Sequence, residues 1–154
     1  MRLSMTAAFA AAIMCSTLAG CQTTKEAEGI QSGTGSIEWT AERRAGHRLE
    51  GGAPSPVITL DGPPPSGAVT LKIAMTDLDN PGWNHGGGSV DVATLDGTVI
   101  PEGAVKGNYY GPGGGMRRPT LNNRYEFRIS AVDAGGTTLA KWRIVERCCA
   151  DMGF

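Results

Sequence analysis

The sequence predicts an all-β protein, and three observations support this fold class. Apolar and polar residues alternate over short segments, glycine- and proline-rich stretches separate those segments, and no stretch after residue 20 keeps a period of 3.6 residues. Glycine accounts for 23 of the 154 residues, which favours strands joined by tight turns because glycine destabilises helix interiors. We therefore expect one sandwich or barrel of about seven to nine strands.

The alternation is clearest in two segments. Leu71, Ile73 and Met75 alternate with other residues in TLKIAMT, and the residues from Tyr125 to Ala131 alternate in RYEFRISA. One apolar and one polar face is typical of a half-buried antiparallel strand. Shorter candidate strands lie at residues 37–40, 57–60, 89–93 and 139–144. The stretches GPPPSG, DNPGWNHGGG, LDGTVIPEG, GPGGG and DAGG between the strands predict turns or loops.

The N-terminus is typical of an export signal. Arg2 supplies a positive charge, an apolar run follows at residues 7–14, and the small residues LAG precede Cys21. LAGC resembles the bacterial lipobox, whose cysteine becomes the first residue of the mature protein and carries a diacylglyceryl group and an amide-linked chain such as palmitate. The alternative is an ordinary cleavage site in which Cys21 has no special role.

The lipobox resemblance implies a protein tethered to the membrane by a lipid anchor. Several acyl chains give stable anchoring, since each buried methylene contributes about 0.8 kcal/mol. Gln22 follows the cysteine, where an aspartate would signal retention in the inner membrane in similar lipoproteins. The expected location is therefore the bacterial cell envelope, at the outer membrane and facing the periplasm.

These features divide the chain into three regions. Residues 1–20 form the lipoprotein signal peptide, residues 21–36 the acylated cysteine and a flexible tether, and residues 37–154 the β domain. The tether is expected because QTTKEAEGIQSGTG has almost no apolar content and no period. A single domain of this length buries a workable core without disulfides.

Charge and cysteine content exclude some functions. The net charge of −1 provides no basic surface of the kind that nucleic acid requires. Cys15 is removed with the signal peptide and Cys21 carries the lipid in this interpretation. The neighbours Cys148 and Cys149 are then the remaining thiols. They could close a strained ring, stay reduced or cross-link two molecules.

The densest polar cluster, DLDNPGWNHGGG, follows the end of a predicted strand. Asp77, Asp79 and Asn80 open like a calcium loop, but Pro81 and Gly88 stand where a ligand and the bidentate glutamate belong. A metal site from Asp77, Asp79 and His85 lacks further histidines nearby. An anion pocket is another reading, because histidine and glycine-rich backbone both offer N–H donors. The alternative is that Asp77 caps a turn and His85 packs at a strand end.

A second cluster, NYYGPGGGMRR, carries aromatic residues into a turn. It lacks the Gly-Lys-Ser/Thr of a phosphate-binding loop and the helix of a dinucleotide fingerprint. Arg117 and Arg118 either form a solvated loop or draw anions inward. Ser89 lies in no G-x-S-x-G elbow, so nucleophilic catalysis finds little support.

Read together, residues 55–140 resemble the phosphatidylethanolamine-binding protein family, in particular its bacterial Raf kinase inhibitor-like members. SPVITLDGPPPSG is similar to the family's Ser-Pro strand and G-x-P-x-G turn, and LKIAMTDLDNP to its strand ending in D-P-D-x-P. YYGPGGG and NNRYEFRISAVDAGG are similar to Y-x-G-P-x-P-P and to H-R-Y-x-F with its following strand. Asn123 replaces the histidine of H-R-Y, and three glycines replace the proline-rich part.

The resemblance implies a Greek-key β-sandwich of two antiparallel sheets with few short helices. It also implies a pocket at the strand ends for phosphate or a phosphorylated head group. Asp79 and Pro81 would support the turn, and no metal or other cofactor is implied. Carried over by position, the ligand-binding residues are Asp77, His85, Tyr109, Gly111, Pro112 and Asn123.

The sequence thus predicts a binding protein and not an enzyme. Its expected ligand is phosphate or a phosphorylated small molecule. One alternative is an interaction or inhibitor protein with a partner in the cell envelope. Another is a degenerate scaffold whose pocket has lost its function, since asparagine cannot become a cation as histidine does.

Overall fold

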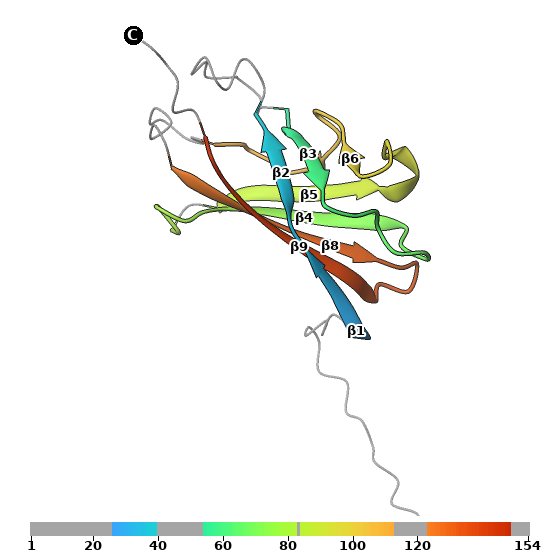
Figure 1. The fold of residues 1–154 in the computed structure, drawn as a ribbon. Helices are drawn as coiled ribbons and strands as arrows, with labels where there is room; N and C mark the ends of the chain where they lie inside the picture. Colours follow the sequence, from blue (N-terminus) through green and yellow to red (C-terminus); the bar gives the residue numbers. More distant parts are fainter. Residues whose placement is uncertain (1–25, 40–53, 83, 113–122, 149–154) are drawn as a thin grey trace, which may run out of the picture.

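The computed structural model describes residues 26–39, 54–82, 84–112 and 123–148. These residues form nine strands and one short 3-10 helix, and Figure 1 shows their arrangement. The elements are β1 (Glu26–Gly33), β2 (Gly35–Glu38), β3 (Val57–Leu60), β4 (Thr70–Asp77), β5 (Asn84–Asp91), η1 (Val92–Thr94), β6 (Val99–Ile100), β7 (Lys106–Gly107), β8 (Arg124–Val132) and β9 (Thr138–Arg147).

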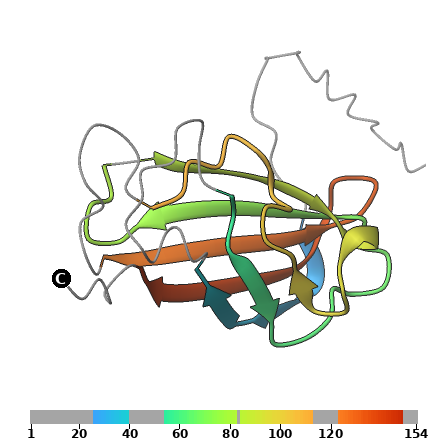
Figure 2. The same ribbon diagram turned by 90° about the horizontal axis from the view of Figure 1, so that it is seen from above.

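The strands form two sheets, which confirms the all-β sandwich. The larger sheet has the order β1-β9-β8-β4-β5-β7, and the smaller has the order β2-β3-β6. Figure 2 shows the long strands of the larger sheet side by side, with β3 and β6 lying across them. The larger sheet is mixed, because β1 runs parallel to β9 while its other pairs are antiparallel. The expectation of two antiparallel sheets is therefore wrong for this edge.

The start of the β domain also differs from the sequence prediction. Residues 26–33, which were expected to belong to the tether, form β1 and pair with β9, with Ser32 opposite Lys141. The sequence of β1 is polar and lacks the alternation that predicts a strand. An edge strand can form without it, because it is held mainly by main-chain hydrogen bonds and buries few side chains. The segment predicted as residues 37–40 is likewise shifted, since β2 spans Gly35–Glu38.

The core lies between the two sheets and is built by the alternation seen in the sequence. Leu71, Ile73 and Met75 of β4 point inward, and their partners on β8 include Ile129 and Phe127. Buried rows therefore run across the sheet, each combining residues from neighbouring strands. The buried hydrophobic residues of this core lie between Ile37 and Cys148.

Candidate functional site

The inward row of β4 ends in a carboxylate. Asp77 continues the series after Met75 and is only 2% exposed. Three N–H donors bind this carboxylate: the main-chain nitrogens of Asp79 and Asn80 donate to Oδ1, both at 2.9 Å, and Asn123 Nδ2 donates to Oδ2 at 2.8 Å. Because a buried charge is costly unless hydrogen-bonded, these donors are what allow Asp77 to stand at the end of the core.

His85 reaches this carboxylate from a β-bulge in the next strand. Ala74 pairs with Gly87 and Thr76 pairs with Asn84, so Met75 alone on β4 faces both His85 and Gly86 on β5. The glycines of NHGGG predict a turn here, followed by a strand at residues 89–93. The structure corrects this, because β5 already begins at Asn84.

Gly86 makes the bulge possible. Its φ of +72° lies in the left-handed region, and a Cβ atom at this position would lie 1.7 Å from the main-chain oxygen of Asn108. A bulge with a left-handed glycine bends the strand and changes the direction of the side chain next to that glycine. At this bulge the neighbour is His85, whose side chain is buried beside Asp77.

Only one of the two ring nitrogens of His85 forms a hydrogen bond within the described residues. Nδ1 lies 2.9 Å from the Gly111 main-chain oxygen, which can only accept, so Nδ1 carries a proton and donates it. Nε2 lies 3.8 Å from Asp77 Oδ2, beyond hydrogen-bonding distance. Among the residues that the structure describes, the buried Nε2 atom has no hydrogen-bond partner.

An aromatic side chain fixes the plane of the imidazole. The rings of His85 and Tyr125 meet edge to face, with centroids 5.3 Å apart. Tyr125 lies opposite Asp77 on β8 and is 1% exposed. The alternation in RYEFRISA predicts an inward position for Tyr125 but gives no sign of its contact with His85.

The segment before residue 113 closes the cluster from the side of β5. The main-chain nitrogen of Tyr110 donates to the His85 oxygen at 3.1 Å, and Gly111 supplies the acceptor for Nδ1. Tyr109 and Pro112 are buried, whereas the side chain of Tyr110 is 53% exposed. The loop therefore positions the histidine through its main chain and presents one aromatic ring to solvent.

Asp79 lies outside the cluster and binds Arg124. It accepts the Arg124 main-chain nitrogen at 2.7 Å and the guanidinium Nη2 at 2.6 Å. The side-chain hydrogen bonds from Arg124, followed by the main-chain one, lower the pKa of Asp79 from 3.8 to about 2. The pair joins the turn after β4 to the first residue of β8, so Asp79 is directed away from His85.

The structure thus brings together Asp77, His85, Gly111 and Asn123, with Tyr109 and Pro112 in the adjoining loop. Pro81 lies in the exposed turn between β4 and β5. Cys21, the glycines at 113–115, Arg117 and Arg118 lie outside the described residues. Cys148 is buried and disulfide-bonded, and its main-chain nitrogen donates to Asn123.

Neither a metal cluster nor a membrane-spanning helix is found in the described ranges. Within them, no three His, Cys, Asp or Glu side chains lie close enough to hold a metal ion. The described residues also include no helix with the length and apolar content needed to cross a membrane.

Comparisons with protein-family models, curated proteins and solved structures found no match to this chain. The geometry of the cluster is therefore the basis for assigning a function.

Proposed function

We propose that this protein is a lipid-tethered envelope protein that binds a small anionic group, such as phosphate or a phosphorylated head group, beside His85. The observation that carries the proposal is the buried Nε2 atom of His85, which has no hydrogen-bond partner among the described residues. Because leaving a buried polar group unsatisfied costs about 1–3 kcal/mol, a group that satisfies Nε2 stabilises the site.

The protonation chemistry favours an anion. Nδ1 already donates to Gly111, so a second proton on the imidazole resides on Nε2 and turns it into a cationic donor. Asp77 Oδ2 lies 3.8 Å from the same nitrogen. The Asp77 oxygens are already bound by three N–H groups. Asp77 therefore acts as the residue that positions the site, while His85 makes the contact to the ligand.

The experiment is a titration of a chain that starts at Gln22, directly after the proposed lipidation site, with inorganic phosphate and with glycerol phosphate. The main-chain amide signals of Gly86, next to His85, and of Gly111, which binds Nδ1, report binding in NMR spectra and remain present when His85 is replaced. We expect a saturable shift that His85→Ala abolishes, with at least a tenfold loss of affinity. His47→Ala removes the chain's other histidine and serves as the matched control, with affinity unchanged. Absence of a saturable shift for both anions in the unchanged chain would disprove the proposal.

The lipid anchor is tested separately. The proposal rests on the sequence LAGC ending at Cys21, and labelling cells with a palmitate analogue checks it. Cys21→Ser should remove the label and release the protein from the membrane fraction. Incorporation of label into Cys21→Ser would contradict anchoring at this residue.

A second candidate function is docking of an envelope protein on the same surface. It is favoured by the side chain of Tyr110, which is 53% exposed beside the buried cluster, since exposed tyrosines are common anchors of protein interfaces. Cross-linking in cells separates the two functions. A partner that is retained in His85→Ala and lost in Tyr110→Ala supports docking.

A further inference from the structure

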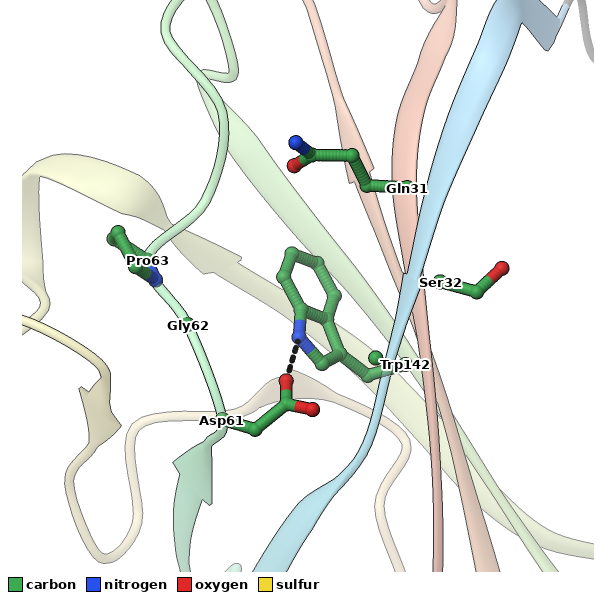
Figure 3. A pocket seen from close by; sticks show the side chains of 7 residues that line it. Gln31, Ser32, Asp61, Gly62, Pro63 and Trp142 are labelled. Carbon is green, nitrogen blue, oxygen red and sulfur yellow. Dashed lines mark hydrogen bonds between the residues drawn. The ribbon is translucent and has the colours of Figure 1, made fainter.

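A cavity of about 360 Å³ lies outside the His85 cluster, between β1, β9 and the turn that follows β3. Figure 3 shows the indole of Trp142 inside it, with Gln31 on one side and the turn of Asp61, Gly62 and Pro63 on the other. This volume lies within the range of small-molecule sites. None of the residues lining the cavity belongs to the proposed anion site, so the two sites can be tested independently.

Gly33 lets the edge strand lie close to Asp61 and Trp142 at the cavity. A Cβ atom at Gly33 would lie 2.5 Å from Asp61 Oδ1 and 2.6 Å from Trp142 Nε1. Any side chain at this position would therefore displace both groups. Since β1 pairs with β9 so that Gly33 faces Trp142, the edge strand places its smallest residue directly over the indole.

The carboxylate in the cavity is fixed by neutral donors. Asp61 Oδ1 accepts from Trp142 Nε1 at 3.0 Å, and Oδ2 accepts from the main-chain nitrogen of Thr34 at 2.8 Å. The lining residues include no lysine, arginine or histidine. Within the described part of the chain, Asp61 forms no ion pair, so the cavity keeps one uncompensated negative charge.

We propose that this cavity binds a small organic ammonium ion. The exposed Asp61 carboxylate supplies the opposite charge. Trp142 is 5% exposed, and the part of its ring that lines the cavity is of the aromatic kind that attracts quaternary and primary ammonium groups. The amide of Gln31 adds a neutral polar group at the rim. The two sites differ in their donors, because this cavity has no histidine, lysine or arginine in its lining to bind an anion, whereas the other site has the imidazole of His85.

The test uses tetramethylammonium chloride as the probe and a chain that starts at Gln22, which contains every described strand. The indole N–H of Trp142 gives an NMR signal that is sensitive to its Asp61 partner. We expect a saturable shift with tetramethylammonium and none with sodium chloride at the same ionic strength. Asp61→Asn should weaken binding about tenfold, because it removes a full charge. Glu102→Gln, an exposed residue outside the cavity, removes the same charge and should leave binding unchanged.

Two variants of opposite charge at Gln31, at the rim of the cavity, keep the test decisive if Asp61→Asn does not fold. Gln31 is exposed, so Gln31→Lys and Gln31→Glu should both fold, with several-fold weaker and several-fold tighter binding, respectively. Saturation-transfer NMR on the probe measures both. The proposal is overturned if tetramethylammonium gives no saturable shift, if Asp61→Asn folds and binds equally, or if the Gln31 pair shows no difference. Equal binding of His85→Ala and the unchanged chain is expected and separates this site from the anion site.

Discussion

At the residue scale, Asp77 is the residue on which both the core and the site depend. It occupies an inward position of β4 where hydrophobic side chains precede it, and it binds the turn after β4 as well as Asn123. A carboxylate in this position links the folding of the turn to the placement of the site.

We expect Asp77→Ala to lower the free energy of unfolding by about 2–4 kcal/mol, since it leaves buried N–H donors without an acceptor. Urea denaturation measures this loss. Asp96→Ala is the control, because Asp96 is exposed and its replacement should change stability by less than about 0.5 kcal/mol. Equal stability of the two variants would show that the turn does not depend on the carboxylate.

Asp79 gives a prediction about pH. Its pKa is lowered to about 2 by Arg124, so its contribution to folding is fully present above the ordinary value of 3.8 and is lost as the pH falls through about 2. NMR titration of the side-chain carbon should give a midpoint near 2. Arg124→Ala should return the midpoint toward 3.8, whereas a midpoint already near 3.8 in the unchanged chain would contradict the ion pair.

At the scale of elements, the bulge in β5 determines where His85 points. A regular strand would put one residue opposite Met75, but the extra residue puts both His85 and Gly86 there. Only one of the two carries a side chain, and so the imidazole has room beside Asp77. The strand pairing and the site therefore depend on the same glycine.

Gly86→Ala should destabilise the protein by about 2 kcal/mol or more, because a left-handed residue with a side chain is strained and its Cβ atom would meet Asn108. Gly97→Ala separates the backbone strain from the steric contact with Asn108. Gly97 also has a positive φ of +64°, but a Cβ atom there would meet nothing within 4 Å. Thermal and urea denaturation should show the larger loss for Gly86→Ala, and equal losses would argue against the steric contact.

At the scale of the whole molecule, the position of β1 changes both the domain boundary and the proposed attachment to the membrane. The domain begins by Glu26, so five residue steps separate it from Cys21. Five residues span at most about 17 Å when fully extended. The proposed anchor would consequently hold the sandwich close to the lipid surface.

Truncation tests the contribution of β1. A chain that starts at Thr34, which lacks β1 but keeps all of β2, should have a lower melting temperature than one that starts at Gln22. It should also aggregate more readily, since removing β1 exposes the edge of β9. Calorimetry and light scattering check the two effects. Equal melting temperatures would mean that β1 adds no stability to the sheet.

Much of the fold could be predicted from local patterns. The segment 57–60 matches β3, and TLKIAMT and RYEFRISA lie within β4 and β8, because half-buried strands carry a period of two that is visible in the chain. β1 was missed because it lacks that pattern, and the start of β5 was missed because glycines at residues 86–88 are typical of turns. The grouping of Asp77, His85 and Asn123 was implied by the family resemblance and not by local pattern, whereas the contact with Tyr125 was implied by neither.

The sequence by itself determined the all-β class and the inward faces of the main strands, since alternation is a local property that burial of apolar side chains enforces. Only the tertiary structure decided that β1 joins β9, that the bulge at Gly86 turns His85 toward Asp77, and that Gly33 lies against the pair of Asp61 and Trp142 that lines the cavity. These depend on which strands become neighbours and in which register, and register is set by packing between segments distant in the chain.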